Sequence, residues 1–458
     1  MVLPPVRQAV RQTAPDRDRL LDALRGFSLI AVVLGHVAMA MVAWTGSGEP
    51  VVGNLLGAAP LLQVVTWFLQ VIPLFFLAGG AANAMSWRRA QQRGIGYSAW
   101  VWGRVERLYR PVLAYLAFLA IAATIATSAV GTASEAILAL ACQMLWFLGI
   151  YVMATMLLPG MLLLHDRNHL LAFVVGVPVI TVLNLGVTFW SWPPWASFLN
   201  FLLVWLLAQQ LGFFWFERTR ARTWAALLLF CLPVSIALVA LGPWPMSLVG
   251  IPGEAVSNMA PPSVVLLLHT GTLCAIVYLA RAPLTRWLHR PTPWLVAVTM
   301  SMTAMTVYLW HVPAMVGAVM GLHAVGLGPA TEVVDGIPRP ISLSAYGSWW
   351  LVFLVVFLFI LVGLVLLLWP VEHARLPIWD GPRRLALRDP SRAPAARPLT
   401  VMGSILIGCA TLVLAIIGFA GFPGKWIPWF GLDLNSLTAC LVLLFGSAVV
   451  RGAAGRSR

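Results

Sequence analysis

Charged residues are scarce in this chain of 458 residues. Only 10% of the side chains are charged and 60% are hydrophobic, whereas roughly 25% are charged in an ordinary soluble chain. A single core cannot hide that much apolar side chain from water, so the composition excludes a soluble globular protein. Nearly uncharged windows of about 18 residues or more recur along the sequence, and each is long enough to cross a hydrocarbon core of about 30 Å.

Cysteine is also rare, and its placement argues against a disulfide framework or a zinc finger. None of the cysteines forms a CxxC pair or a zinc-type spacing, and all of them fall inside apolar runs, at Cys142, Cys231, Cys274, Cys409 and Cys440. We interpret them as small buried hydrophobic residues.

The sequence has a single lysine, and arginine supplies the other 28 basic residues. A net charge of +14 would favour nucleic acid binding if it lay on one exposed patch. The arginines instead occupy short segments between apolar runs, which is typical of topology determinants and of contact with anionic lipid head groups. We therefore expect membrane lipids, and no nucleic acid, as partners.

Hydropathy predicts twelve membrane spans. They cover about residues 20–43, 61–86, 111–130, 136–164, 170–189, 197–216, 224–242, 263–280, 294–320, 348–370, 400–420 and 430–450. The first run is long enough to remain as a span, so we expect no cleaved signal peptide.

The basic residues support this count. With a cytoplasmic amino terminus, the cytoplasmic segments hold 26 of the 29 basic residues; these segments are 1–19, 87–110, 165–169, 217–223, 281–293, 371–399 and the tail after 450. The opposite side holds only Arg339 and Lys425, and the remaining basic residue, Arg25, lies within the first span. The prediction is therefore an all-α polytopic transmembrane helical bundle in the cell membrane, with both termini cytoplasmic.

The domain organisation follows from these segments. A cytoplasmic tail (1–19) precedes a ten-span core (20–370), and a Pro/Arg-rich cytoplasmic linker (371–399) leads to two additional transmembrane helices (400–450) and a second tail (451–458). No soluble catalytic domain is evident, so any chemistry must use residues within the membrane or at its faces.

The first span carries two ionisable residues on one helical face. Arg25 and His36 are eleven residues apart, which at about 100° per residue nearly completes three turns and places the imidazole roughly 16 Å deeper than the guanidinium. Asp22 lies one turn before Arg25 and is expected to orient it as an ion pair. Ionisable groups inside spans are costly and mark functional sites, although Arg25 could also snorkel and His36 could be satisfied by a neighbouring helix.

The basic segment 87–110 is a second candidate. Arg104 and Arg107 share a helical face in it, and planar guanidinium groups bind phosphate well. The alternative is a positive-inside determinant that rests on lipid phosphates.

Two further histidines, His269 and His311, are predicted near the depth of His36. Tyr308 precedes His311 by one turn. Three imidazoles at one depth could bind a metal, but no carboxylate or thiolate accompanies them, so we expect none.

Together these segments resemble bacterial acyltransferase family 3, a group of integral membrane O-acyltransferases. The first span matches the Arg-x10-His signature of that family, and Arg104-Val-Glu-Arg107 resembles its Arg-x-x-Arg pair. Phe75 to Gly80 is similar to its Phe-Phe-x-x-Ser-Gly stretch, with Gly79 in place of the serine, and the segments Leu145–Leu148 and Tyr308–His311 resemble later landmarks. The likeness covers the first ten spans.

The resemblance implies transfer of an acyl group, usually acetyl, from cytoplasmic acyl-coenzyme A to a hydroxyl of a cell-surface glycan, glycolipid or glycosylated small molecule. His36 would act as general base or would carry the acyl group, and we favour the base. Arg25 would support the donor site and Arg104 and Arg107 would bind phosphate. Tyr308, His311 and Trp146 are expected to line the acceptor pocket, with no metal.

Two other interpretations fit the same pattern. Twelve spans with both ends inside are common in secondary transporters, so proton-coupled export through His36 and His311 is the main rival. A transporter would favour a long central loop after span six, whereas that connection (217–223) is short. A non-catalytic membrane scaffold is the third interpretation, and the oligomeric state is not predicted.

Overall fold

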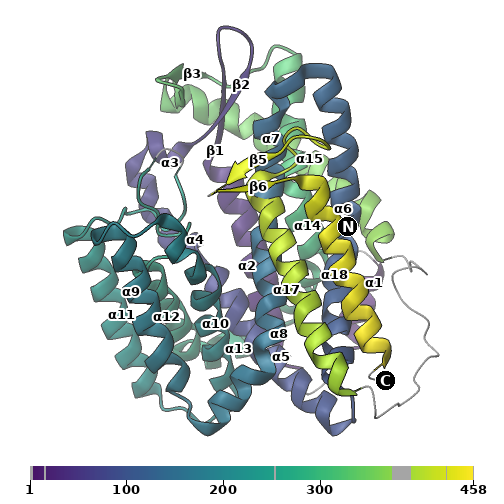
Figure 1. The fold of residues 1–458 in the computed structure, drawn as a ribbon. Coiled ribbons are helices and arrows are strands. Elements are labelled where there is room, and N and C mark those ends of the chain that lie inside the picture. Colours follow the sequence, from purple (N-terminus) through teal and green to yellow (C-terminus); the bar gives the residue numbers. More distant parts are fainter. Residues whose placement is uncertain (1–3, 15–16, 252–253, 374–392, 430, 457–458) are drawn as a thin grey trace. The chain divides into compact units, whose positions relative to one another are not determined.

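The computed structural model describes residues 4–14, 17–251, 254–373, 393–429 and 431–456. Within them, 11 helices are long and apolar enough to cross a membrane, and the number is 12 if one bent pair counts as a span. The predicted all-α polytopic bundle is thereby confirmed (Figure 1).

Each predicted span corresponds to a helix or, for the eighth, to the bent pair. The long helices are α2 (Arg19–Met39), α5 (Ile72–Gln92), α6 (Tyr97–Val130), α8 (Leu145–Arg167), α9 (Leu171–Phe189), α10 (Asn200–Phe213), α11 (Ala221–Leu241), α12 (Val264–Leu279), α14 (Pro291–Ala324), α15 (Leu343–His373), α17 (Ala393–Ile417) and α18 (Ser436–Arg456). The chain bends by 61° where α12 passes into α13 (Arg281–Leu288).

Short elements connect these helices. They are α1 (Pro4–Arg11), α3 (Leu55–Ala58), α4 (Thr66–Leu69), α7 (Glu135–Gln143) and the 3-10 turns η1 (Pro60–Val65), η2 (Gly131–Ser134), η3 (Pro194–Leu199) and η4 (Phe214–Phe216). In the described part of the chain, three two-stranded sheets pair β1 (Ala40–Trp44) with β2 (Pro50–Asn54), β3 (Thr331–Val334) with β4 (Ile337–Pro340), and β5 (Ile427–Trp429) with β6 (Leu432–Leu434).

The basic segment 87–110, predicted to connect two spans, is mostly helical. α5 continues to Gln92 and α6 begins at Tyr97, so only residues 93–96 connect the two helices. Hydropathy detects the apolar part of a helix and stops where arginines begin, although the backbone hydrogen bonds continue. At the predicted linker 371–399, α15 continues to His373 and α17 begins at Ala393. The linker residues 374–392 lie outside the described residues.

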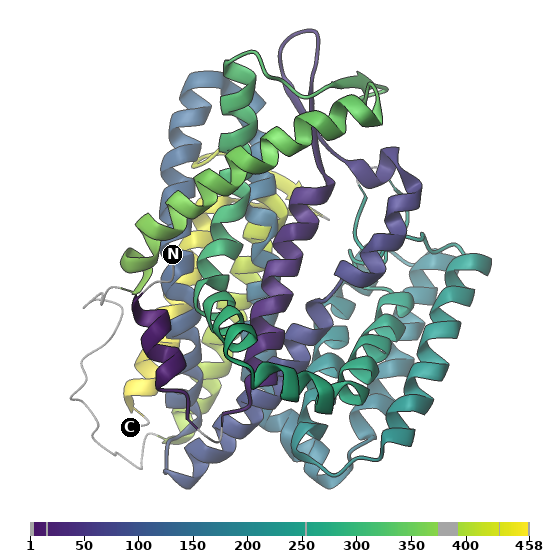
Figure 2. The same cartoon turned by 180° about the vertical axis from the view of Figure 1, so that it is seen from behind.

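The chain forms two compact units that interleave in sequence. The first contains Met1–Ala40, Asn54–Met85 and Leu158–Tyr308, and the second contains Met41–Gly53, Ser86–Leu157 and Leu309–Arg458. In the second unit, α15 runs obliquely to the other helices (Figure 2).

Small residues allow close helix packing in the first unit. A Cβ added to Gly80 of α5 would collide with the carbonyl oxygen of Gln209 in α10, and one added to Gly212 of α10 would collide with that of Leu77 in α5. In a membrane, where lipid supplies no hydrophobic drive between helices, such close contact is a main source of association. The final glycine of the motif at 75–80 therefore has a packing role.

The last two helices of the second unit, α17 and α18, also pack closely at glycine residues. A Cβ on Gly403 of α17 would lie 2.8 Å from the carbonyl oxygen of Gly446 in α18, and the reverse distance is also 2.8 Å. In addition, the hydroxyl groups of Tyr109 in α6 and Thr411 in α17 are 2.8 Å apart. These contacts fix α17 and α18 to α6.

The start of α2 packs tightly against α14. A Cβ added to Gly26 would lie 2.9 Å from both the backbone nitrogen and the Oγ of Ser301, and the Ser301 hydroxyl donates a hydrogen bond of 2.8 Å to the carbonyl of Asp22. Gly35 on the same helix has only Leu69 Cδ1 near its missing Cβ, at 4.0 Å.

We therefore expect Gly26→Ala to lower the thermal unfolding midpoint of the detergent-solubilised protein, because overpacking a close contact costs about 1–3 kcal/mol. Gly35→Ala is the matched control. It gains the helix propensity of alanine, about 1 kcal/mol, without a clash, so its midpoint should stay equal or rise. Equal midpoints for the two variants would contradict the packing described here.

Candidate active site

The amino-terminal end of α2 is held by a side chain that makes several contacts. One carboxylate oxygen of Asp18 accepts hydrogen bonds of 3.1 Å from the backbone N–H groups of Leu20 and Leu21. The other oxygen accepts one of 2.6 Å from the indole N–H of Trp215. The Arg281 guanidinium lies 4.2 Å over the Trp215 ring and 3.8 Å from the same carboxylate. This arrangement caps the helix and fixes its start.

Arg25 and His36 both lie in α2, which is continuous from Arg19 to Met39. Their spacing therefore places them on one helical face, as the sequence predicts. Both side chains are half-buried. The Arg25 guanidinium lies 5.8 Å from the centroid of the Phe75 ring in α5. In the part of the chain that the structure describes, its buried Nε has no hydrogen-bond partner, so this donor is available to a ligand.

Asp22 does not form the expected ion pair with Arg25. Its carboxylate instead lies 2.5 Å from Nε of Arg17, which precedes the helix. Arg17 lies just before the helix, where its backbone N–H donates to the carbonyl of Ala14, whereas the Arg25 guanidinium lies over Phe75. Asp22 also lies in the first helical turn, where a negative charge interacts favourably with the helix dipole.

Arg104 and Arg107 belong to the second unit and lie one turn apart in α6. Arg104 Nη2 donates to the Ser86 hydroxyl, and its guanidinium lies 5.6 Å from the Trp100 ring centroid. Arg107 is exposed, and its Nε donates a hydrogen bond of 2.9 Å to the carbonyl of Gly103. One guanidinium is thus held by the protein, and the other is open to solvent.

Helix α17 holds the part of α6 that carries this arginine pair. Before the pair, Thr400 Oγ1 donates a hydrogen bond of 2.7 Å to the hydroxyl of Ser98. After the pair, Tyr109 meets Thr411. The carboxy-terminal helices therefore contact the same segment of α6 in which the sequence predicts a phosphate site.

The three predicted acceptor residues lie on two helices. Tyr308 and His311 are one turn apart in α14 and are 3% and 0% exposed. Trp146 near the start of α8 is half-buried, and its ring meets that of Phe147 edge-on at a centroid distance of 6.1 Å. The two α14 side chains are interior groups, and Trp146 is partly accessible.

His269 in α12 is the third predicted intramembrane histidine. It is 2% exposed, and Trp67 approaches it edge-on with the ring centroids 5.7 Å apart. It is therefore an interior residue of α12.

His165, His169 and Glu217 form a cluster that was not predicted from the sequence. One possible ligand atom from each of these side chains lies within 4.8 Å of the other two. The His-x3-His spacing was a readable signal, because ligand pairs often take it, but Glu217 is 48 residues after His169 and only the fold brings it close.

Comparison with known proteins agrees with the resemblance seen in the motifs. A family model described as an acyltransferase domain matches residues 18–369, which is more than half of the chain. No curated protein and no solved structure matches it. The match begins at Asp18, the capping residue of α2, and ends within α15, so α17 and α18 lie beyond it. The chain therefore belongs to acyltransferase family 3, as a multi-pass membrane enzyme that transfers acyl groups other than aminoacyl groups.

Proposed function

We propose that this protein is an acyl-coenzyme A-dependent O-acyltransferase of the cell membrane. The donor is acetyl-coenzyme A on the cytoplasmic side, and the acceptor is a hydroxyl group of a cell-surface glycan, a glycolipid or a glycosylated small molecule. The observation that carries this proposal is the placement of Arg25 and His36 on one face of a single apolar helix. Burying charged or titratable side chains in a membrane costs free energy, so such residues in an apolar helix indicate a functional site.

In this mechanism His36 is the general base. Its imidazole removes the proton from the acceptor hydroxyl, and the hydroxyl oxygen attacks the carbonyl carbon of the thioester. The carbon–sulfur bond then breaks, and the coenzyme A thiolate leaves and takes the proton from the imidazolium. Imidazole suits both proton transfers because it exchanges protons near neutral pH. These steps require no metal ion.

Arg25 supports the donor in this proposal. Its buried Nε has no protein partner among the described residues, so it has a free N–H donor on the face that leads to His36. A guanidinium that already stacks on Phe75 is held in place before substrate binds, which reduces the entropy lost on binding. Asp22 forms an ion pair with Arg17 and so holds the Arg17 guanidinium at the amino-terminal end of α2.

Arg104 and Arg107 bind the phosphates of coenzyme A. Arg107 is exposed and can turn its guanidinium edge to a phosphate, while Arg104 is steadied by Ser86 and Trp100. Guanidinium groups form paired, charge-assisted hydrogen bonds with phosphate oxygens. Tyr308, His311 and Trp146 contribute to the acceptor pocket, in which the indole of Trp146 would stack on a sugar face.

Replacement of the proposed base tests the chemistry. His36→Ala should lower acetyl transfer on the order of 10²- to 10⁴-fold, the usual contribution of a general base, while the protein still accumulates in the membrane. Cells receive isotopically labelled acetate, and mass spectrometry of their surface glycans and glycolipids follows the added acetyl mass. His289→Ala, an exposed histidine after α13, is the control and should transfer normally. Full transfer by His36→Ala would exclude a role for this imidazole as base.

Changes to the arginine pair test donor recognition. Arg104→Ala and Arg107→Ala should each raise the KM for acetyl-coenzyme A roughly 10- to 100-fold, because each removes a charge-assisted hydrogen bond worth about 1.5–3 kcal/mol. Acetyl-pantetheine lacks the nucleotide phosphates, so its KM should be unchanged in the same variants. Arg286→Ala, at an exposed position of α13, is the charge-matched control. Equal effects on both donors would argue against phosphate recognition by this pair.

A further inference from the structure

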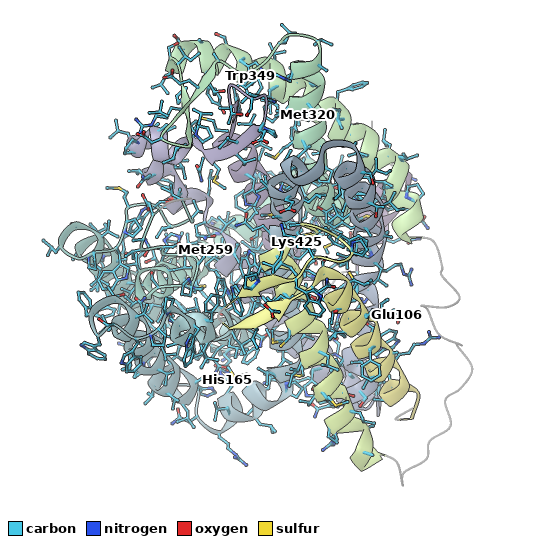
Figure 3. All side chains as sticks on the ribbon, turned by 45° about the horizontal axis from the view of Figure 1, so that its top comes forward. Glu106, His165, Met259, Met320, Trp349 and Lys425 are labelled. Atoms are coloured by element: carbon cyan, nitrogen blue, oxygen red, sulfur yellow. The ribbon has the colours of Figure 1, made fainter. Side chains whose placement is uncertain are left out.

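A group of possible metal ligands includes none of the residues assigned to acyl transfer. His165 is in the last turn of α8 (labelled in Figure 3), and His169 follows in the short connection to α9. Glu217 comes directly after η4, at the end of α10. All three belong to the first unit.

The spacing of their donor atoms fits a small cation. His165 Nε2 lies 2.6 Å from Glu217 Oε1 and 3.2 Å from His169 Nδ1, and His169 Nδ1 lies 3.7 Å from Glu217 Oε1. Ligands of a tetrahedral zinc ion, with bonds of about 2.0–2.2 Å, are separated by roughly 3.3 Å. The three separations bracket this value, so an ion needs only small side-chain rotations.

A neighbouring amide can orient the buried ligand. The other ring nitrogen of His165, Nδ1, lies 2.8 Å from Gln210 Nε2, while Gln210 Oε1 is buried and has no hydrogen-bond partner among the described residues. The two ends of the amide can therefore exchange places without breaking another bond. In the exchanged orientation Oε1 accepts from the Nδ1–H of His165, which leaves Nε2 free for a metal. This second contact is typical of histidine ligands.

The cluster is closed on one side and open on the other. The His165 side chain is 0% exposed and packs edge-on against the rings of Phe213 and Phe214, at centroid distances of 5.5 Å and 4.8 Å. The side chains of His169 and Glu217 are 55% and 31% exposed. A cation can therefore enter from solvent, and a water molecule can complete its coordination.

We propose that His165, His169 and Glu217 form a zinc site with a water as fourth ligand. Two imidazoles and one carboxylate are a ligand set that zinc takes readily. No residue of the proposed acyl-transfer chemistry belongs to it, so the ion connects the end of α8 to the end of α10 as a structural clip. This inference does not depend on the proposed function, and it differs from the sequence-based expectation that the chain holds no metal.

Zinc binding is tested on the full-length protein in detergent, purified through a tag without histidine. After treatment with a chelator and removal of the chelator, the protein is titrated with zinc in competition with a chromophoric chelator, and bound metal is counted by mass spectrometry. We expect one zinc per chain and a higher thermal midpoint with zinc than without it. His169→Ala and Glu217→Gln should weaken binding about 100-fold or more, since loss of a partner outside the ligand set alone costs about 10- to 100-fold. His289→Ala is the control and should bind as the wild type does.

A ligand exchange separates coordination from a merely structural effect. His169→Cys supplies a thiolate, which zinc also accepts, so it should recover most of the affinity that His169→Ala loses. With cobalt in place of zinc it should show a thiolate-to-metal charge-transfer band that the wild type lacks. Wild-type protein that binds no zinc after reloading would overturn the proposal. Binding that is the same in His169→Ala, Glu217→Gln and His289→Ala would also overturn it and would indicate an adventitious ion only.

Discussion

The cap that Asp18 places on α2 is the constraint on which the first unit depends most. One oxygen of this carboxylate closes the helix and the other binds the indole of Trp215, with Arg281 beside both. Because a helix advances by a fixed angle per residue, fixing its first turn fixes the direction of every later side chain. The faces of Arg25 and His36 are thus decided about two turns before Arg25 and about five turns before His36.

Close backbone contact maintains this arrangement along the helix. Gly26 lets α2 lie directly on α14 at Ser301, and Gly80 and Gly212 bring α5 against α10. Lipid tails are as apolar as the side chains of the helices, so no hydrophobic effect drives the helices together. Helices in a membrane therefore associate through close packing and through polar contacts. The Phe75 ring under Arg25 is carried by α5, and its position therefore follows from the same glycine contacts.

The spans and the principal candidate residues could be predicted from the sequence, because apolar length and arginine placement are local properties. Hydropathy placed several boundaries incorrectly. It stopped short where arginines extend α5 and α6. It also carried the first span to residue 43, although α2 ends at Met39 and strand β1 follows. The partner of Asp22 was also missed. The helical spacing pointed to Arg25, but Arg17 lies outside the helix and its approach depends on how the preceding segment folds back.

The sequence by itself determined that this chain spans a membrane many times, that Arg25 and His36 share a face, and that its motifs resemble acyltransferase family 3. Each of these three properties follows from residue spacing or composition within single segments of the chain. Only the tertiary structure decided that Asp18 meets Trp215, that α17 contacts α6 on both sides of the arginine pair, and that Glu217 joins His165 and His169. Those contacts unite residues far apart in the chain, and helix packing rather than local periodicity brings them together.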